Sequence, residues 1–218
     1  MTYKEIKKDE TINAYISGAD RMLEAIGYNE HSFAHVTRVA ETARYILREL
    51  GYGERECELV GIAAHLHDIG NVINRHDHAQ SGALLAFSLL TERRMPADDI
   101  ATVICAIGNH DEDTGSPVDP VSSALILADK SDVRRSRVRR TEASAADIHY
   151  RVNYSVESSS LKVNAETREV VLTISIDTQY SSVSEYFEIF LGRMILCRKA
   201  AERLGLRFRL NINGQVLM

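Results

Sequence analysis

Through the first two thirds of the chain, hydrophobic residues recur every three or four positions, the spacing that predicts amphipathic helices. Two such runs occupy His35–Leu50 and Arg55–Asp68, and each is followed by a glycine, Gly51 or Gly70, that indicates a helix end. Polar loops are expected at residues 71–77 and 111–120. The remaining predicted helices are His78–Leu90, a helix from Pro96 towards His110, and Val121–Asp132.

After about residue 150 the hydrophobic residues alternate with polar ones, a pattern typical of half-buried strands. We expect strands around 152–156, 161–163 and 170–176 and a last strand at Leu206–Leu210. Between them, Ser184 predicts the N-cap of a helix that ends near Gly205. The sequence therefore predicts a mainly α protein, with a helical domain over residues 1–150 and a small α+β unit over residues 151–218.

Length and composition narrow the class of protein. A chain of 218 residues can bury roughly 70% of its unfolded surface, so it needs no disulfide or other staple. Its net charge of −5 argues against generic nucleic-acid binding. Three scattered cysteines, a polar start and the lack of an apolar run of about eighteen residues predict a cytoplasmic protein without a membrane span.

The candidate chemistry begins with His67 and Asp68, which end an apolar helical run. A buried imidazole and carboxylate are costly to desolvate unless a cation neutralises them. Other His and Asp residues stand near the ends of the neighbouring predicted helices, and helix ends that converge bring such side chains together. This mixed nitrogen and oxygen set suits iron, manganese, cobalt, nickel or zinc better than calcium or magnesium alone. The candidate ligands are His35, His67, Asp68, His78, His110 and Asp129.

In this order, these residues resemble the HD-domain superfamily of metal-dependent phosphohydrolases. The resemblance covers roughly residues 20–135 and rests on HLHDIG around His67, HAQSGALL from His78, and LADKSD around Asp129. It implies an HD-type helical bundle that binds one or two divalent metals. By the resemblance, one metal requires four ligands and a second metal adds two histidines, so a chain that has all six is expected to hold two. The four are His35, His67, Asp68 and Asp129, and the two are His78 and His110.

Three positions depart from the related HD-GYP branch of the superfamily. That branch has a Lys directly after HDIG, where this chain has Asn71, and often two consecutive histidines, where this chain has only His110. Its Gly-Tyr-Pro triplet is absent, so hydrolysis of cyclic di-GMP is not inferred. His31 stands where some members of the branch place an extra carboxylate ligand. Surface placement is favoured for His31, and a third-metal ligand or a supporting role stays open.

A basic run follows Asp129. In one interpretation its side chains hold a substrate phosphate, because guanidinium forks match phosphate oxygens, and Lys130 and Arg134 are then the candidates by proximity. In the other, equally favoured, the run is a solvated segment that balances acidic neighbours or docks another subunit. The run consists of Lys130, Arg134, Arg135, Arg137, Arg139 and Arg140.

These features favour a phosphatase or phosphodiesterase that acts on a small-molecule phosphate or a nucleotide. A metal-activated hydroxide would attack phosphorus at a binuclear site, with Asp68 as the catalytic residue that bridges the metals and orients the nucleophile. Lys130 and nearby arginines would stabilise charge on the phosphate. Two alternatives are a di-iron oxygenase on the same scaffold and a non-enzymatic nucleotide-sensing module. For the C-terminal unit three roles stay open: receiver of a signal from such a sensing module, lid over the substrate, or interface of a homodimer.

Overall fold

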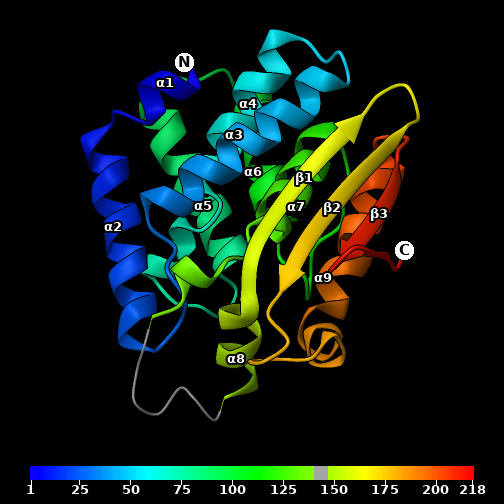
Figure 1. Cartoon of the computed structure of the whole chain (residues 1–218). Coiled ribbons are helices and arrows are strands. Elements are labelled where there is room, and N and C mark those ends of the chain that lie inside the picture. Colours follow the sequence, from blue (N-terminus) through cyan, green and yellow to red (C-terminus); the bar gives the residue numbers. More distant parts are fainter. Residues whose placement is uncertain (140–146) are drawn as a thin grey trace.

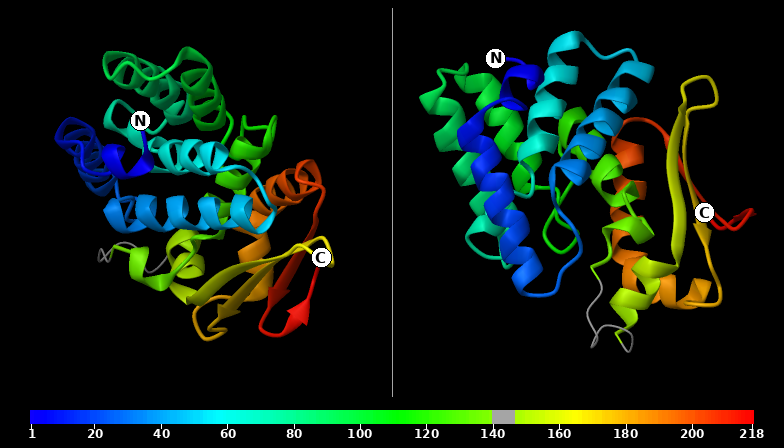
Figure 2. Two further views of the ribbon diagram at one scale, coloured as in Figure 1. Left: turned by 90° about the horizontal axis from the view of Figure 1, so that it is seen from above. Right: turned by 60° about the vertical axis from the view of Figure 1, so that its left-hand side comes forward.

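A computed structural model describes residues 1–139 and 147–218, which form a helical body with a small sheet along one side (Figures 1 and 2). Within these ranges no helix has the length and apolar character needed to cross a membrane. The helical body comprises α1 (Tyr3–Ile6), α2 (Glu10–Ala25), α3 (Phe33–Glu49), α4 (Glu54–Leu66), η1 (Ile69–Val72), α5 (His78–Glu92), α6 (Ala97–Gly108), α7 (Pro120–Ser131) and η2 (Arg135–Arg137).

Helix α7 forms the centre of the bundle, where it contacts α3, α4, α6 and α9. Its segment from Val121 to Ala128 is buried on every side, as expected for a helix whose residues are small or apolar all round. Asp119 and Ser122 form a reciprocal capping box at its N-terminus, and Pro120 occupies the first turn. The helix thereby carries Asp129 and Lys130 at its C-terminal end into the middle of the molecule.

The absence of a side chain at Gly70 allows α5 to begin close to the end of α4. A Cβ atom at Gly70 would collide with the backbone of His78 and Gly82. The sequence predicted a helix to about Asp68 and a polar loop from residue 71, and the structure differs from this in detail. Helix α4 ends at Leu66, and η1 continues the chain through Gly70 in a tighter 3₁₀ turn.

The C-terminal unit is a four-stranded sheet with one long helix. The strands follow the order β1-β2-β3-β4, with β2 and β3 parallel and the other pairs antiparallel. Helix α9 connects the two parallel strands and packs against α7, so it lies between the sheet and the bundle (Figure 2). The elements are α8 (Ile148–Ser155), β1 (Val156–Asn164), β2 (Glu169–Ile176), α9 (Val183–Arg203), β3 (Arg207–Ile212) and β4 (Gln215–Val216).

The predicted fold class, a mainly α bundle followed by a small α+β unit, is confirmed. One continuous hydrophobic core joins the two parts, and the boundary at residue 150 stays a prediction. Two local predictions are wrong. The alternation at 152–156 belongs to α8, where the buried Val152 and Ser155 are three residues apart and thus on one helical face. Helix α9 is capped by Ser182, which pairs with Glu185, and not by Ser184.

Candidate metal centre

The six candidate ligands lie together because the helices that carry them end at one place in the bundle. His35 is in the first turn of α3, and His67 caps α4 with Asp68 directly after it. His78 is the first residue of α5, whereas His110 follows the end of α6. Each of these side chains is buried, and Asp129, in the last turn of α7, is nearly so, with a side chain 12% exposed. The structure therefore brings all six together.

Four of these residues form a first group of donor atoms. The Nε2 atoms of His35 and His67 are 3.3 Å apart, and Asp129 Oδ1 lies 3.4 and 3.5 Å from them. Asp68 Oδ2 completes the group at 3.1 Å from His67 Nε2 and 3.6 Å from His35 Nε2. His35, His67 and Asp129 present ligand atoms that all lie within 4.8 Å of one another, so this donor set could hold one divalent cation.

The second group uses the other oxygen of Asp68. His78 Nε2 and His110 Nε2 are 3.2 Å apart, and Asp68 Oδ1 lies 3.5 Å from the first and 4.0 Å from the second. One carboxylate therefore faces both groups, with a different oxygen toward each. Asn71 holds this orientation, since its Nδ2 donates hydrogen bonds to Asp68 Oδ1 and to the Asp68 carbonyl at 3.0 and 2.9 Å.

The outer nitrogens of the histidines support metal binding. The Nδ1 atoms of His67, His78 and His110 face the carbonyl oxygens of Ala64, Arg75 and Ile107 at 2.8, 3.2 and 2.6 Å. A carbonyl can only accept, so each Nδ1 carries a proton, and each Nε2 is the inward-facing nitrogen that can bind a metal once it carries no proton. Lone pairs that face each other at 3.2–3.3 Å repel unless a proton or a cation lies between them. The residues present therefore fit a bound metal.

The pKa values of His67 and His110 show which of these histidines carries a proton that a metal must displace. Burial opposes the charged form of His67, but the carboxylates of Asp68 and Asp129 outweigh it and raise the pKa of His67 to about 10. For His110, burial and the charge on His67 lower the pKa to about 3. Without a metal, His67 therefore holds a proton that neutralises the carboxylates, and a metal must release that proton in order to bind.

Asp132 is a part of the site that sequence reasoning did not identify. Its Oδ2 accepts a hydrogen bond from His35 Nδ1 at 2.8 Å, which fixes the ring of that candidate ligand. Burial opposes its charge, but the hydrogen bonds from His35 and Arg134, with the charge of Arg137, hold the pKa of Asp132 well below its usual range. The available signal was its position three residues after Asp129, at the end of the same helix.

A second buried network extends from the site into the C-terminal unit. Lys130 Nζ lies 2.8 Å from Asp129 Oδ2 and 2.6 Å from Glu112 Oε2, and Arg193 Nε of α9 lies 2.9 Å from Glu112 Oε1. Lys130 thus holds one oxygen of Asp129 while the other faces the imidazoles. The sequence predicted a polar loop around Glu112 and a helix that includes Arg193, but only the folded chain brings the two segments to Lys130.

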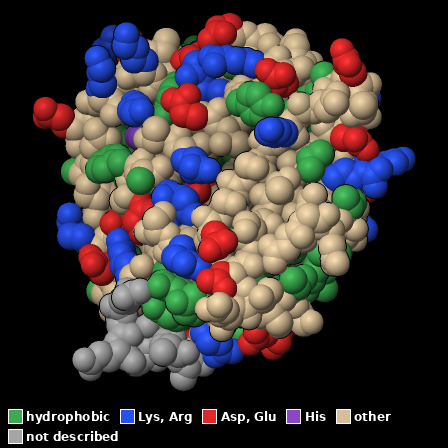
Figure 3. All heavy atoms as spheres, in the orientation of Figure 1, with side chains coloured by type: hydrophobic (Ala, Val, Ile, Leu, Met, Phe, Trp, Pro, Cys, Tyr) green, Lys and Arg blue, Asp and Glu red, His purple; other side chains and the backbone are tan. Residues whose placement is uncertain are grey.

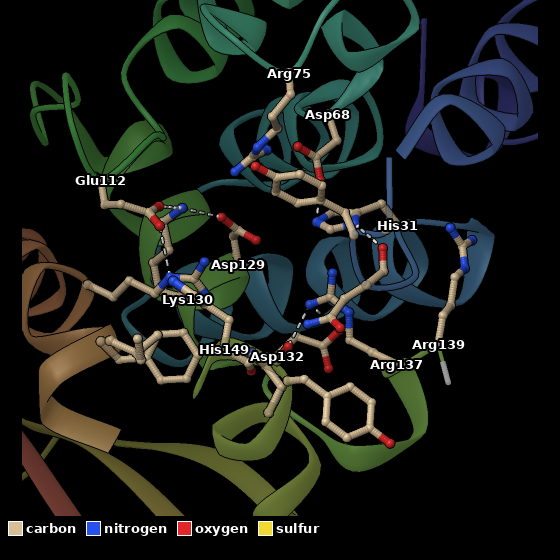
Figure 4. Close-up of a pocket in the computed structure, with 18 of the residues that line it drawn as sticks. His31, Asp68, Arg75, Glu112, Asp129, Lys130, Asp132, Arg137, Arg139 and His149 are labelled. Carbon is tan, nitrogen blue, oxygen red and sulfur yellow. Dashed lines mark hydrogen bonds and ion pairs between the residues drawn. The ribbon is translucent and has the colours of Figure 1, made fainter. Parts of the chain in front are cut away.

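Both groups of donor atoms open into a cavity of about 390 Å³ (Figure 4). Lys130 and His149 line it, and so does His31, for which the sequence favoured surface placement but whose side chain is only 15% exposed. Arg134 is not among the lining residues, and its guanidinium instead pairs with Asp132 at 2.8 Å. The cavity also has aromatic walls, formed by Tyr28, Tyr150 and Phe190.

The rest of the basic run serves mostly as structure. Arg135 donates to the carbonyl of Tyr154 at 2.6 Å, and Arg137 is buried with a hydrogen bond to the Asp132 carbonyl at 2.7 Å. Arg140 lies outside the described residues. His31 is within reach of the centre, with Nε2 3.9 Å from Asp68 Oδ2 and Nδ1 2.7 Å from the carbonyl of Asn29.

In this bundle, converging helix ends present buried imidazoles and carboxylates to a cavity. This arrangement is typical of a metal-binding helical domain. Comparison with known proteins agrees with this class. Residues 32–137 match the HD domain family, and this segment contains all six candidate ligands. Residues 32–137 therefore form an HD domain.

Two similar proteins extend beyond this segment. An uncharacterized protein of Methanocaldococcus jannaschii is 26% identical over 213 residues, which span 87% of this chain and 80% of that protein. A solved structure described as a predicted HD superfamily hydrolase, from an uncultured Thermotogales bacterium, is 26% identical with a TM-score of 0.46. That match covers 62% of this chain and 75% of the other.

His65, a buried residue of α4, provides a test of how the stability of the fold depends on pH. Its ring packs edge-on against Tyr3 at 5.8 Å, and neither ring nitrogen has a hydrogen-bond partner among the described residues. Burial is the main cause that lowers the pKa of His65 from 6.5 to about 4. Between these two pKa values His65 binds a proton in the unfolded chain but not in the folded chain. The free energy of unfolding therefore decreases as the pH falls from 6.5 towards 4.

We expect His65→Phe to reduce this acid sensitivity. Between pH 7 and pH 5 the wild type should lose about 2 kcal/mol more free energy of unfolding than the variant, since one pKa unit corresponds to about 1.4 kcal/mol. Urea unfolding of both chelator-treated proteins at the two pH values measures the difference. Parallel losses in the two proteins would contradict the assignment.

Proposed function

We propose that the protein is a metal-dependent phosphohydrolase with a binuclear centre that cleaves a phosphate ester of a small molecule or nucleotide. The observation that carries the proposal is the placement of Asp68 between two pairs of inward-facing imidazoles, with one oxygen toward each pair. When bound, two divalent metals would act as Lewis acids and lower the pKa of water so that a nucleophile forms near neutral pH.

The roles of the protein's own residues follow from their positions. The first metal would be held by His35, His67, Asp129 and one oxygen of Asp68, and the second by His78, His110 and the other oxygen. Asp68 would also orient the attacking water, because it lies where the two groups meet. Lys130 keeps Asp129 in place and adds positive charge at the cavity wall, where developing charge on the phosphate needs it.

Charge balance in the cavity supports an anionic substrate. Among the described residues, five basic and five acidic side chains line the cavity, so their formal charges cancel. Two divalent cations would leave this lining with a net positive charge, which favours a phosphate over a neutral substrate. The volume of about 390 Å³ lies within the range of about 300–1,000 Å³ typical of small-molecule sites.

The outer surface does not contribute to the proposal. On the face that carries β1 and β2, basic and acidic side chains are interspersed and no broad patch of one sign forms (Figure 3). The absence of generic nucleic-acid binding, the homodimer and the cytoplasmic location remain predictions.

The second metal position is tested most directly by His110→Gln. We expect the metal content to fall from two ions per chain to one, because the second group then has only one imidazole and one shared carboxylate oxygen. Elemental analysis gives the metal count, and a phosphate-release screen over nucleotides and sugar phosphates with manganese, iron and cobalt gives the activity.

Loss of activity in His110→Gln together with one retained metal supports the binuclear hydrolase. A variant that keeps one metal and full phosphate release would show that the second metal is not required. Oxygen consumption that depends on reduced iron, without phosphate release in the wild type, would support the di-iron oxygenase instead.

A further inference from the structure

The cationic side chains of the cavity differ in one respect, namely whether the protein itself neutralises them. Lys130, Arg137, Arg139 and Arg193 each have a carboxylate oxygen within 3.6 Å of a side-chain nitrogen. For Arg75, the remaining basic residue of the lining, no carboxylate partner exists among the described residues. In Figure 4 its side chain extends into the cavity near Asp68. Arg75 is therefore the lining cation with an unmatched charge.

The guanidinium group of Arg75 lies beside the second group of donor atoms, where it contacts His78. Its Nη1 is 3.2 Å from His78 Nε2, while His78 Nδ1 donates to the carbonyl of Arg75 at 3.2 Å. The Nε2 lone pair of His78 is thus the acceptor for the guanidinium. The guanidinium also lies over the ring of Tyr28, with Arg75 Cζ 5.5 Å from the ring centroid.

This hydrogen bond cannot persist when His78 binds a metal, because the metal takes the same lone pair. The guanidinium would then lose its acceptor and lie close to a divalent cation that repels it. An anion bound beside that cation would satisfy both positive groups. The planar fork of Arg suits the oxygens of a phosphoryl group, to which it can donate two hydrogen bonds.

We propose that Arg75 binds the phosphoryl group of the substrate at the second metal position, exchanging His78 for the phosphate oxygens when the metal is present. This rests on the proposed function, since it requires both a metal at His78 and His110 and a phosphate beside it. Arg75 then takes the role that the sequence assigned to Arg134, whose guanidinium is committed to Asp132.

Arg75→Gln is expected to change two affinities in opposite directions. Inorganic phosphate should bind the manganese-loaded variant at least about 10-fold more weakly than the wild type, the low end for a lost charge-assisted hydrogen bond. In the absence of phosphate, the second manganese ion should bind more tightly, because a competing and repelling cation has been removed. Isothermal titration calorimetry measures both affinities. A purely structural defect would weaken both.

Arg94→Gln is the matched control, because Arg94 is an exposed arginine just beyond the opposite end of α5, about 22 Å from His78 by helix length. It should bind phosphate and manganese as the wild type does. Arg75→Lys keeps the charge but loses the planar fork, so it should bind phosphate with an intermediate affinity. This variant still tests the proposal if Arg75→Gln does not fold.

The proposal is overturned if the Arg75→Gln variant binds phosphate as tightly as the wild type does. It is also overturned if the variant binds the second manganese ion more weakly than the wild type does. These results would leave the proposed function intact as long as the wild type holds two metals and releases phosphate. A wild type that does neither would remove the proposed function and the role of Arg75 together.

Discussion

Asp68→Asn is expected to lose at least one metal and to lower phosphate release by at least about 10³-fold, equivalent to about 4 kcal/mol of transition-state stabilisation. The carboxylate places Oδ2 3.1 Å from His67 Nε2 and Oδ1 3.5 Å from His78 Nε2, so each metal position depends on it. An amide keeps the shape but has only one oxygen, and its NH₂ group would turn donors toward one pair of imidazoles.

The measurement pairs elemental analysis with phosphate release, and circular dichroism confirms that the variant is folded. Asp98→Asn, on the exposed side of α6, provides the same chemical change away from the site and should leave metal content and activity unaltered. A folded Asp68→Asn protein that retains two metals and wild-type phosphate release would refute the bridging role and, with it, the proposed mechanism.

The sequence was sufficient to locate the candidate ligands because each follows from a local rule. His67 and Asp68 end an apolar helix, and His78 and His110 stand at predicted helix boundaries, so convergence of helix ends predicts their proximity. This prediction of proximity did not require the helix crossing angles, and the structure does bring these residues together. For the same reason the fold class was predictable, since the change from helical to alternating spacing near residue 150 is a local pattern.

The residues that support the ligands could not be predicted in this way. Glu112 and Arg193 meet at Lys130 although 81 positions separate them, and no local pattern relates a loop after α6 to the middle of α9. From the sequence, Arg134 was a candidate phosphate ligand because it lies close to Asp129, and Arg75 was not considered. Only the folded structure shows that Arg75 points into the cavity and Arg134 pairs with Asp132.

The strand predicted at residues 152–156 was wrong because the pattern behind it was too short. Val152 and Tyr154 fit an alternation of only three members, which is too short to separate a strand from one face of a helix. Asp147, whose side chain accepts the backbone N–H of His149, caps α8 and is the local signal for a helix at this point. Tertiary contact with α9 then fixes the element.

Asp132→Ala is expected to reduce both the stability of the fold and the metal affinity of the first group. Asp132 is 3% exposed, and its carboxylate lies within 3.6 Å of Arg38, Arg134 and the buried Arg137. Its removal takes away the carboxylate that most favours the charged form of the buried Arg137, which costs up to about 3–5 kcal/mol in the free energy of unfolding. It also frees the ring of His35, which should weaken metal binding about 10–100-fold.

Asp132→Asn separates these two effects. The amide oxygen can still accept the hydrogen bond from His35 Nδ1, so metal affinity should stay near that of the wild type, whereas the lost charge should still destabilise the fold. Asp99→Ala is the control, because it removes a carboxylate that pairs with Arg55, an arginine that is 40% exposed. Its loss should lower the free energy of unfolding by less than about 1 kcal/mol. Urea unfolding and metal titration of the three variants give the comparison.

The pH dependence of the Asp132→Ala defect provides an independent check. The folded pKa of Asp132 is depressed below the ordinary 3.8, so its contribution to stability is complete above that value and declines as the pH falls through the folded pKa. The stability difference between wild type and variant should therefore be constant from pH 7 to pH 5 and shrink below about pH 4. A difference that instead grows on acidification would show that Asp132 is protonated in the folded protein, and it could not then compensate Arg137 or orient His35 as a carboxylate.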